Sequence, residues 1–356
     1  MVRGGIGIVA FTVALLNRSS ISRHRLYSTE RMEGRSDAFM PSVVEQGGAQ
    51  MWRIYLILTL AGVFLILLSG VPLWDAINIA MTAISTGGFT IHSGGIPAYD
   101  SRILELLIIP VMIAGALPFK IYYLMYRKRE VSLFKDEQAK LLFLLILLGF
   151  VIITADLIVF NGLDQWSALI TGLFMASAAV TSTGFQSADL AIWEPVSVLF
   201  LSILVFIGGS SGSTSGGGVK LSRILIGLKG IKWWFKRSFV SPKALLPLRY
   251  NGKTFQRAEA EFLVSRNMLT VVLFLLPILF ALVIIMHFEQ PDIDTTLVIF
   301  DVISATCNNG ISTGFISPPD LTVWSKLVLI LQMWLGRLEV MAVMVFFIGL
   351  IRGFEW

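Results

Sequence analysis

Charged residues, cysteine and histidine are all scarce in this sequence of 356 residues. Asp, Glu, Lys and Arg together make up 14% of the chain, whereas soluble domains average about 25%. The single cysteine, Cys307, excludes a disulfide bond within the chain. The three histidines lie near the ends of apolar segments and do not form a metal-ligand or Ser–His pattern. We therefore expect neither a soluble domain nor an enzyme.

Apolar residues, in contrast, make up 55% of the chain. Several apolar segments reach the roughly 20 residues that a helix needs to cross a bilayer. The clearest candidates for membrane spans are 52–71, 103–126, 141–160, 268–287 and 327–351, with two further candidates at 5–16 and 196–228. The sequence thus predicts an all-α integral membrane protein that is surrounded by membrane lipid.

The positive charges lie mostly in three connectors between the apolar segments, at 18–50, 127–140 and 229–265. This distribution follows the positive-inside rule, so we expect the basic connectors to be cytoplasmic and the protein to cross the plasma membrane several times. The formal net charge of +5 does not indicate nucleic-acid binding, because the charges are not gathered on one soluble domain.

A small polar motif recurs three times between apolar helices. The copies are ISTGGFTIHSG at Ile84–Gly94, TSTGFQSADL at Thr181–Leu190 and CNNGISTGF at Cys307–Phe315. Each follows a segment of roughly 10–15 residues, rich in Ala, Ile and Ser, that is too short to cross a bilayer. One copy alone would indicate an ordinary turn, but the recurrence at matching positions favours a re-entrant half-helix followed by a pore loop.

Such loops place non-helical backbone at membrane depth, where each unsatisfied N–H or C=O group costs several kcal/mol, roughly. They are therefore expected to line a water-filled cavity. A ring of inward-facing carbonyl groups can replace the hydration shell of a monovalent cation. Half-helices that point their C-terminal ends inward would favour a cation as well.

A run of glycine, serine and threonine at 208–218 interrupts an apolar stretch. Six glycines and five hydroxyl residues do not form a stable helix, so the run is either an intramembrane gate, a flexible linker or a nucleotide loop. The last of these departs from the phosphate-binding pattern, because Val219 separates Gly218 from Lys220. Lys220 either belongs to this loop or snorkels toward the cytoplasmic end of a helix.

Arg337 lies within another apolar stretch, where a charge costs at least about 2.5 kcal/mol at mid-membrane. It therefore faces either a cavity or a partner in another helix. Glu339 is a poor partner, since residues two apart on a helix point to different sides.

Together these motifs resemble the Trk/Ktr/HKT superfamily of potassium transporters, and most closely its Trk-type membrane subunit. The resemblance rests on the three polar motifs, on the glycine-rich break followed by Val219 and Lys220, and on the segment LGRLE at Leu335–Glu339. The connector SPKALLP, which begins at Ser241, and the Asn-Gly-Lys at Asn251 add to it. The resemblance implies four helix–pore-loop–helix repeats in pseudo-fourfold arrangement around a central ion pore, of which this chain holds three full copies.

The resemblance also implies a selectivity filter that binds K⁺ through backbone carbonyls. Aligned on the Ser-Thr-Gly triplets, its glycines are Gly87 with Gly88 beside it, Gly184 and Gly310. Gly314 is an alternative for the last of these. The expected filter residues are Ser85, Thr86, Gly87, Gly88, Ser182, Thr183, Gly184, Asn308, Asn309 and Gly310. The expected gate residues are Gly208, Gly209, Gly212, Ser213, Thr214, Gly216, Gly217, Gly218, Lys220 and Arg337.

We expect the following division of the chain. Residues 1–17 form the end of an incomplete first repeat, which suggests a fragment or a mis-assigned start codon. The other units are the connectors 18–50, 127–140 and 229–265, and the full repeats 51–126 (pore loop 75–92), 141–228 (pore loop 166–187, gate loop 208–218) and 266–356 (pore loop 295–315).

The function that follows from the resemblance is K⁺ uptake across the cell membrane by a homodimer. Na⁺ or K⁺/Na⁺ transport, and a non-conducting truncated protein, remain alternatives. A cytoplasmic nucleotide-binding regulatory subunit is the expected partner, with 127–140 and 229–265 as candidate docking surfaces. No organic cofactor is expected on this chain, because it carries no dinucleotide fingerprint.

Overall fold

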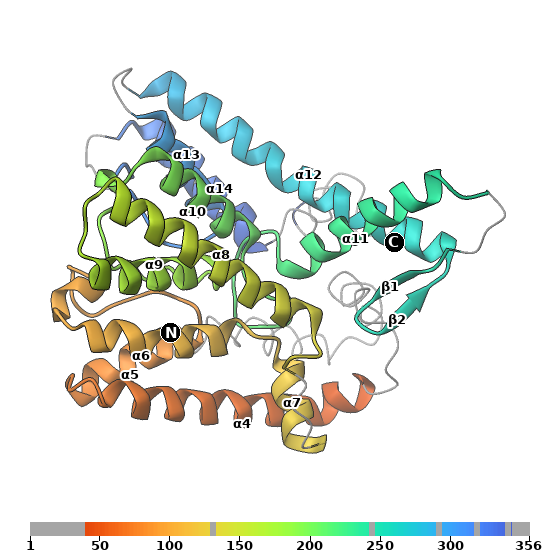
Figure 1. The fold of residues 1–356 in the computed structure, drawn as a ribbon, viewed down its shortest axis with the longest axis horizontal. Helices are drawn as coiled ribbons and strands as arrows, with labels where there is room; N and C mark the ends of the chain where they lie inside the picture. The colour runs from red at the N-terminus through yellow and green to blue at the C-terminus, as the bar shows by residue number, and fades with distance from the viewer. Residues whose placement is uncertain are drawn as a thin grey trace.

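The computed structural model is shown in Figure 1. It describes residues 40–128, 133–241, 246–289, 294–316, 321–338 and 343. The expectations for residues 1–17, for most of the connector 18–50 and for residues 339–342 and 344–351 of the span at 327–351 lie outside the described residues.

The described chain is helical except for one small hairpin and the loops (Figure 1). The helices are α4 Met40–Leu67, α5 Leu73–Ile84, α6 Arg102–Ala116, α7 Phe119–Lys128, α8 Glu137–Val159, α9 Gln165–Val180, α10 Pro195–Ile207, α11 Leu221–Ser238, α12 Arg257–Phe288, α13 Thr295–Thr306 and α14 Val323–Leu338. Two short 3₁₀ turns, η1 Ile96–Tyr99 and η2 Leu190–Ile192, follow the pore-loop segments. The expectation of an all-α fold is confirmed.

Two helices among the described residues are long and apolar enough to cross a membrane, and a third unit qualifies if one bent helix pair is counted as a single span. The two helices are α8 and α12, with 23 and 32 residues. The third is the pair α6 and α7, which bends by 88° at the break between them. The continuous span predicted at 103–126 is therefore wrong in shape. The helix ends before Leu117 and Pro118 because a proline disfavours helical backbone at the residue before it.

The predicted basic connector at 229–265 is itself folded. Helix α11 continues to Ser238, and α12 already begins at Arg257. Between them, strands β1 (Leu248–Tyr250) and β2 (Lys253–Phe255) form an antiparallel hairpin with Leu248 opposite Phe255. These elements enclose a small apolar core of their own, formed by Ile226, Trp233, Leu248, Tyr250, Ala260 and Leu263. In Figure 1 this unit lies to one side of the main helical body.

The short helices α5, α9 and α13 contribute much of the main core, and α9 is the most deeply buried of them. Small residues allow α9 to approach its neighbours. A Cβ atom built on Gly172 would lie 2.2 Å from the Thr154 hydroxyl of α8, and one built on Gly149 would lie 2.9 Å from the Ala176 side chain. Close backbone approach of this kind stabilises helix packing in membranes, where lipid is as apolar as the side chains.

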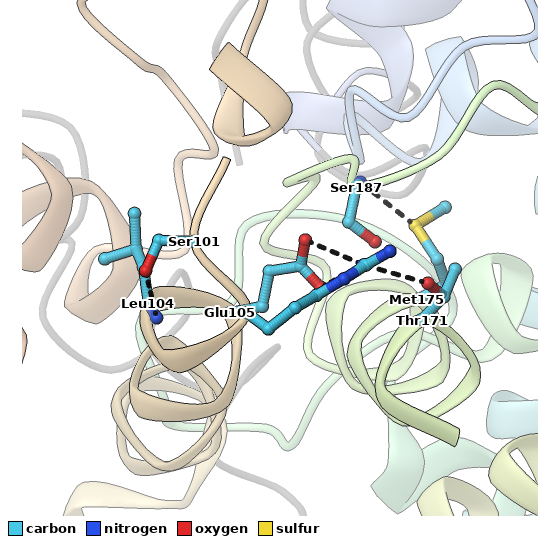
Figure 2. A network of polar contacts seen from close by, with 7 residues as sticks. Ser101, Leu104, Glu105, Thr171, Met175 and Ser187 are labelled. Carbon is cyan, nitrogen blue, oxygen red and sulfur yellow. Dashed lines mark hydrogen bonds and ion pairs between the residues drawn. The ribbon is translucent and has the colours of Figure 1, made fainter. Parts of the chain in front are cut away.

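Polar contacts join α6 to α9 as well. Ser101 caps α6 by accepting a hydrogen bond from the Leu104 amide at 3.3 Å. Arg102 donates from Nη1 to Glu105 at 3.0 Å and to the Thr171 hydroxyl at 3.4 Å. Figure 2 shows the Glu105 carboxylate and Thr171 on opposite sides of this network. The buried Glu105 is thereby provided with a partner at the start of its helix.

Candidate functional site

Each of the three short helices ends in a Schellman motif. In α5, the Thr86 amide donates to the Ala83 carbonyl at 3.1 Å and the Gly87 amide donates to the Thr82 carbonyl at 2.7 Å. The same two bonds end α9, where the Ser182 and Thr183 amides donate to the Ala179 and Ala178 carbonyls, both at 3.1 Å. They also end α13, where the Asn308 and Asn309 amides donate to the Ala305 and Ser304 carbonyls at 3.1 and 3.0 Å. The recurrence of the sequence motif therefore corresponds to one backbone structure repeated three times.

The first residue after each cap is left-handed although it is not glycine. Thr86 has φ 49°, Ser182 has φ 56° and Asn308 has φ 50°. A Schellman motif usually places glycine at this position, and a β-branched residue such as Thr is an outlier there. Such a conformation costs about 1–3 kcal/mol and is concentrated at functional sites. The three segments 85–88, 181–184 and 307–310, hereafter the candidate filter segments, share this strain.

The backbone also defines the register of the glycines. Two residues after each left-handed residue comes a glycine with positive φ: Gly88 at 64°, Gly184 at 82° and Gly310 at 101°. Gly88, and not Gly87, is thus the structural equivalent of the other two. Aligning the Ser-Thr-Gly triplets pairs Gly87 with Gly184, which is one residue away from the structural correspondence. The turn is positioned by the end of the preceding helix, and α5 ends one residue closer to its triplet than α9 does. Gly314 lies four residues beyond the equivalent position.

The three candidate filter segments lie side by side in chain order. A Cβ atom built on Gly88 would be 2.2 Å from the Thr183 carbonyl oxygen, and one built on Gly184 would be 1.8 Å from the Asn309 carbonyl oxygen. The middle segment is buried throughout, whereas Gly310 is exposed. The backbone of 181–184 is therefore enclosed by its two neighbours, and glycine is required where they meet.

The glycine-rich loop, 208–218, connects α10 to α11 and contacts the C-terminal ends of all three short helices. At α5, the Thr214 hydroxyl donates to the Ile84 carbonyl at 2.6 Å. At α9, a Cβ atom on Gly209 would lie 3.4 Å from the Thr181 carbonyl oxygen. At α13, a Cβ atom on Gly217 would lie only 1.5 Å from the carbonyl oxygen of Cys307, a fully buried residue. The loop thus lies across the ends of these helices.

The break between α6 and α7 holds the other side of the glycine-rich loop. The last carbonyls of a helix lack partners within it. The Gly115 carbonyl accepts from the Thr214 amide at 3.2 Å, and the Ala116 carbonyl accepts from the Ser210 amide at 3.3 Å. The Phe119 amide in turn donates to the Gly212 carbonyl at 2.9 Å. This contact between the helix break and the loop is not predicted from the sequence, although the Leu117-Pro118 dipeptide that produces the break is present there.

Arg337 and Lys220 both lie against the glycine-rich loop. A Cβ atom on Gly216 would be 1.8 Å from Nη1 of Arg337, so the guanidinium group directly faces the loop backbone. Helix α14 can carry it there because Gly336 packs against the Thr306 carbonyl of α13, where a Cβ atom would lie 1.6 Å away. Lys220 has a φ of 80° and donates from Nζ to the Ser215 carbonyl of the loop. In this structure Lys220 therefore points back to the loop.

Several buried hydroxyl groups near this loop have no hydrogen-bond partner within the described part of the chain. They belong to Ser182 in the middle candidate filter segment and to Ser210 and Ser215 in the loop. Buried polar atoms normally have a partner, and ordered water or an ion is the usual one where no protein group is available. These three hydroxyl groups are thus available as partners for ordered water.

Comparison with known proteins gives consistent matches. A sequence model of the family described as "TrkH: Cation transport protein" matches residues 2–352. An uncharacterised cation transporter of Methanocaldococcus jannaschii is 30% identical, over 97% of this chain and 67% of its own length. The Trk system potassium uptake protein TrkG of Escherichia coli K12 is 30% identical, over 99% and 71%.

The fold also matches a solved structure. The crystal structure of the potassium transporter TrkH from Vibrio parahaemolyticus superimposes with a TM-score of 0.75 and 23% sequence identity. The match covers 96% of this chain and 69% of that chain. At this identity the likeness concerns the fold alone.

Proposed function

Because the chain belongs to the TrkH family of cation transport proteins, we propose that it conducts K⁺ into the cell through the three candidate filter segments. Family membership makes it a multi-pass membrane transport protein and not an enzyme. K⁺ is the cargo that the names of several relatives state, including TrkG of Escherichia coli and TrkH of Halomonas elongata.

The Schellman motifs support a filter made of carbonyl oxygens. In each motif the amides of the two residues after the cap are used by hydrogen bonds to the helix, as with Thr86 and Gly87. The backbone carbonyl oxygens of these segments are therefore the groups left to bind an ion, and such oxygens can replace the hydration shell of K⁺. The C-terminal ends of α5, α9 and α13 add negative partial charge nearby, each equivalent to about half an elementary charge.

A membrane potential provides the driving force for uptake. It supplies about 2.3 kcal/mol per elementary charge per 100 mV, so accumulation of K⁺ needs no covalent chemistry on this chain.

We assign the glycine-rich loop, with Lys220 and Arg337, to the gate. The single observation that carries this assignment is that one loop contacts the C-terminal carbonyls of all three short helices. A loop in that position obstructs a path that runs between the candidate filter segments. Its glycines at 208, 209, 212 and 216–218 permit the movement that opening requires. Arg337 adds a positive charge that disfavours a cation beside the closed loop.

Flux measurements on filter variants test the proposed filter. Gly88→Ala places a Cβ atom 2.2 Å from the Thr183 carbonyl oxygen, whereas Gly87→Ala finds only ordinary contacts from 3.4 Å outward. In proteoliposomes we expect Gly88→Ala to lose K⁺-over-Na⁺ preference by about tenfold or more, and Gly87→Ala to retain most of it. Equal effects of the two variants would contradict the register.

Preferential Na⁺ flux through the unmodified chain would support a Na⁺ transporter, and no cation flux would support the non-conducting alternative.

We further propose that the protein acts as a homodimer and binds a cytoplasmic nucleotide-binding regulatory subunit on the unit formed by α11, the hairpin and the start of α12. This unit has its own core and exposes basic residues, among them Lys232, Lys236 and Arg249. Co-purification with the nucleotide-binding subunit of a Trk system, followed by mass determination, tests the proposal. A monomer that binds no such subunit would contradict it.

A further inference from the structure

Asp301 is a fully buried carboxylate in the middle of α13, a short apolar helix. It accepts three hydrogen bonds from the loop that follows the third candidate filter segment. The Thr313 amide donates to Oδ1 at 2.8 Å, and the Ser312 hydroxyl and the Ile316 amide donate to Oδ2 at 3.1 and 3.3 Å. A buried carboxyl group is costly unless it is well hydrogen-bonded.

These bonds fix the chain just beyond Gly310. On the near side of the glycine, the Asn308 and Asn309 amides are bonded to the end of α13. On the far side, the Ser304 hydroxyl donates to the Ile311 carbonyl at 2.5 Å, and Asp301 holds the next residues. Both side chains come from α13 itself. Helix α13 therefore holds its own candidate filter segment from both ends, and Asp301 provides the stronger of the two outer attachments.

The equivalent positions in the other two short helices do not carry a carboxylate. Asp301 lies five residues before the last residue of its helix, which corresponds to Ile79 in α5 and Met175 in α9. The Met175 sulfur accepts from the Ser187 amide at 3.5 Å, and this contact is seen in Figure 2. Ser187 follows Met175 by 12 residues, as Thr313 follows Asp301. One geometry is thus used twice, with a weak acceptor in α9 and a strong one in α13.

The strong acceptor occurs in a segment whose glycine is less enclosed than that of the middle segment. The segment 181–184 is buried between the other two, whereas Gly310 is exposed and a Cβ atom there would meet nothing closer than 3.9 Å among the described residues. Attachments within the same helix and loop help a segment with an exposed glycine to keep one conformation.

We propose that Asp301 is a positioning residue that sets the geometry of segment 307–310 and thereby its preference among monovalent cations. The proposal rests on the proposed transport function. Asp301 acts through Ser312, Thr313 and Ile316 and does not touch the ion. Within the described residues it forms no ion pair with Lys or Arg, so its hydrogen bonds are directed to the loop alone.

The test compares Asp301→Met, which copies the chemistry of Met175, with Asp301→Asn and Ser312→Ala. Asp294→Asn is the matched control, because Asp294 caps the start of the same helix through the Thr296 amide at 2.8 Å and is exposed. Two measurements are made on the full chain in detergent and in proteoliposomes: hydrogen exchange of the Thr313 and Ile316 amides, and the ratio of K⁺ to Na⁺ flux.

We expect Asp301→Met to speed exchange at Thr313 and Ile316 by about tenfold or more, with no change at 86–89, and to lower the flux ratio. Asp301→Asn keeps an acceptor oxygen, so its exchange rates and flux ratio should lie between those of Asp301→Met and the unmodified chain. Asp294→Asn should change neither the exchange rates nor the flux ratio. Folded Asp301 variants with wild-type exchange and flux ratio would overturn the proposal. If neither Asp301 variant folds, Ser312→Ala decides it by the same two readouts. Failure of the unmodified chain to conduct would refute the transport function, while the exchange data would still test the attachment.

Discussion

Two interruptions of long helices meet in this molecule, and they are built differently. Helix α6 ends at Ala116, and α7 starts at Phe119 after a Leu-Pro corner that turns the chain by 88°. Helix α10 ends at Ile207, and α11 starts at Leu221 after the glycine-rich loop. Proline fixes its own backbone angle, whereas glycine has more freedom than any other residue. The corner is thus suited to be a fixed frame and the loop to be the part that moves.

The hydrogen bonds between the two interruptions indicate how firmly the loop is held. Ser210, Gly212 and Thr214 bond to residues of the corner, and Thr214 also bonds to the end of α5. A typical hydrogen bond contributes only about 0.5–1.5 kcal/mol net, so this set holds the loop by a few kcal/mol. An equilibrium of that size is readily shifted by a partner or a ligand, as a gate requires.

The largest effect is expected from Gly217→Ala, which adds a side chain where the loop contacts the candidate filter segment 307–310. The new Cβ atom would be 1.5 Å from the Cys307 carbonyl oxygen, so one of the two backbones has to shift, and we expect the glycine-rich loop to be the one that moves. We expect basal K⁺ flux in proteoliposomes to rise by about tenfold or more.

Gly212→Ala is the control for that variant, since a Cβ atom there meets nothing within 4 Å, although the φ of 73° strains the backbone. It should change basal flux much less than Gly217→Ala. If Gly217→Ala leaves flux unchanged in folded protein, the loop does not obstruct the path.

An intermediate effect is expected from Thr214→Val, which removes the donor to Ile84 and Gly115 while keeping the side-chain volume close. Loss of one hydrogen bond to the frame weakens the closed position, so basal flux should rise by roughly threefold to tenfold. Thr214→Ser retains the hydroxyl and should behave as the unmodified chain. Equal flux through both variants would show that this bond does not hold the loop.

The smallest effect is expected from Pro118→Ala, which alters the frame and not the loop. The bend should persist because the carbonyls of Gly115 and Ala116 remain bonded to the loop and are not free to continue α6. We expect basal flux within about twofold of the unmodified chain, measured in the same vesicles. A rise as large as that of Gly217→Ala would mean that the corner moves as well, and the division into frame and moving part would be wrong.

The sequence was sufficient to predict the class of the fold and the places of the short helices. Segments too short to span a bilayer, each followed by a polar glycine motif, correspond to α5, α9 and α13. The register within the first motif was misjudged, because Ser85–Gly87 resembles Ser182–Gly184 in letters but not in backbone. The Gly-Phe pair shared by Gly88 and Gly184 would have given the correct register, since each of these glycines has positive φ and precedes a phenylalanine.

Contacts between distant parts of the chain could not be predicted. The bond from Thr214 to Ile84 joins residues 130 positions apart, and no local pattern specifies it. Asp301 was also overlooked, because a single carboxylate in a short apolar helix gives no periodic signal. Its partners lie after a turn whose path depends on the left-handed Asn308. Local propensity predicts elements, whereas such pairings depend on the packed structure.

The position of Cys307 has a practical consequence. It is the only cysteine in the sequence, it is fully buried, and its carbonyl group lies against Gly217 of the glycine-rich loop. Departure of the loop removes the atoms that cover this part of the chain. We expect the thiol to become accessible when the loop leaves, so that its rate of alkylation by a small maleimide reports the displaced population without an engineered label.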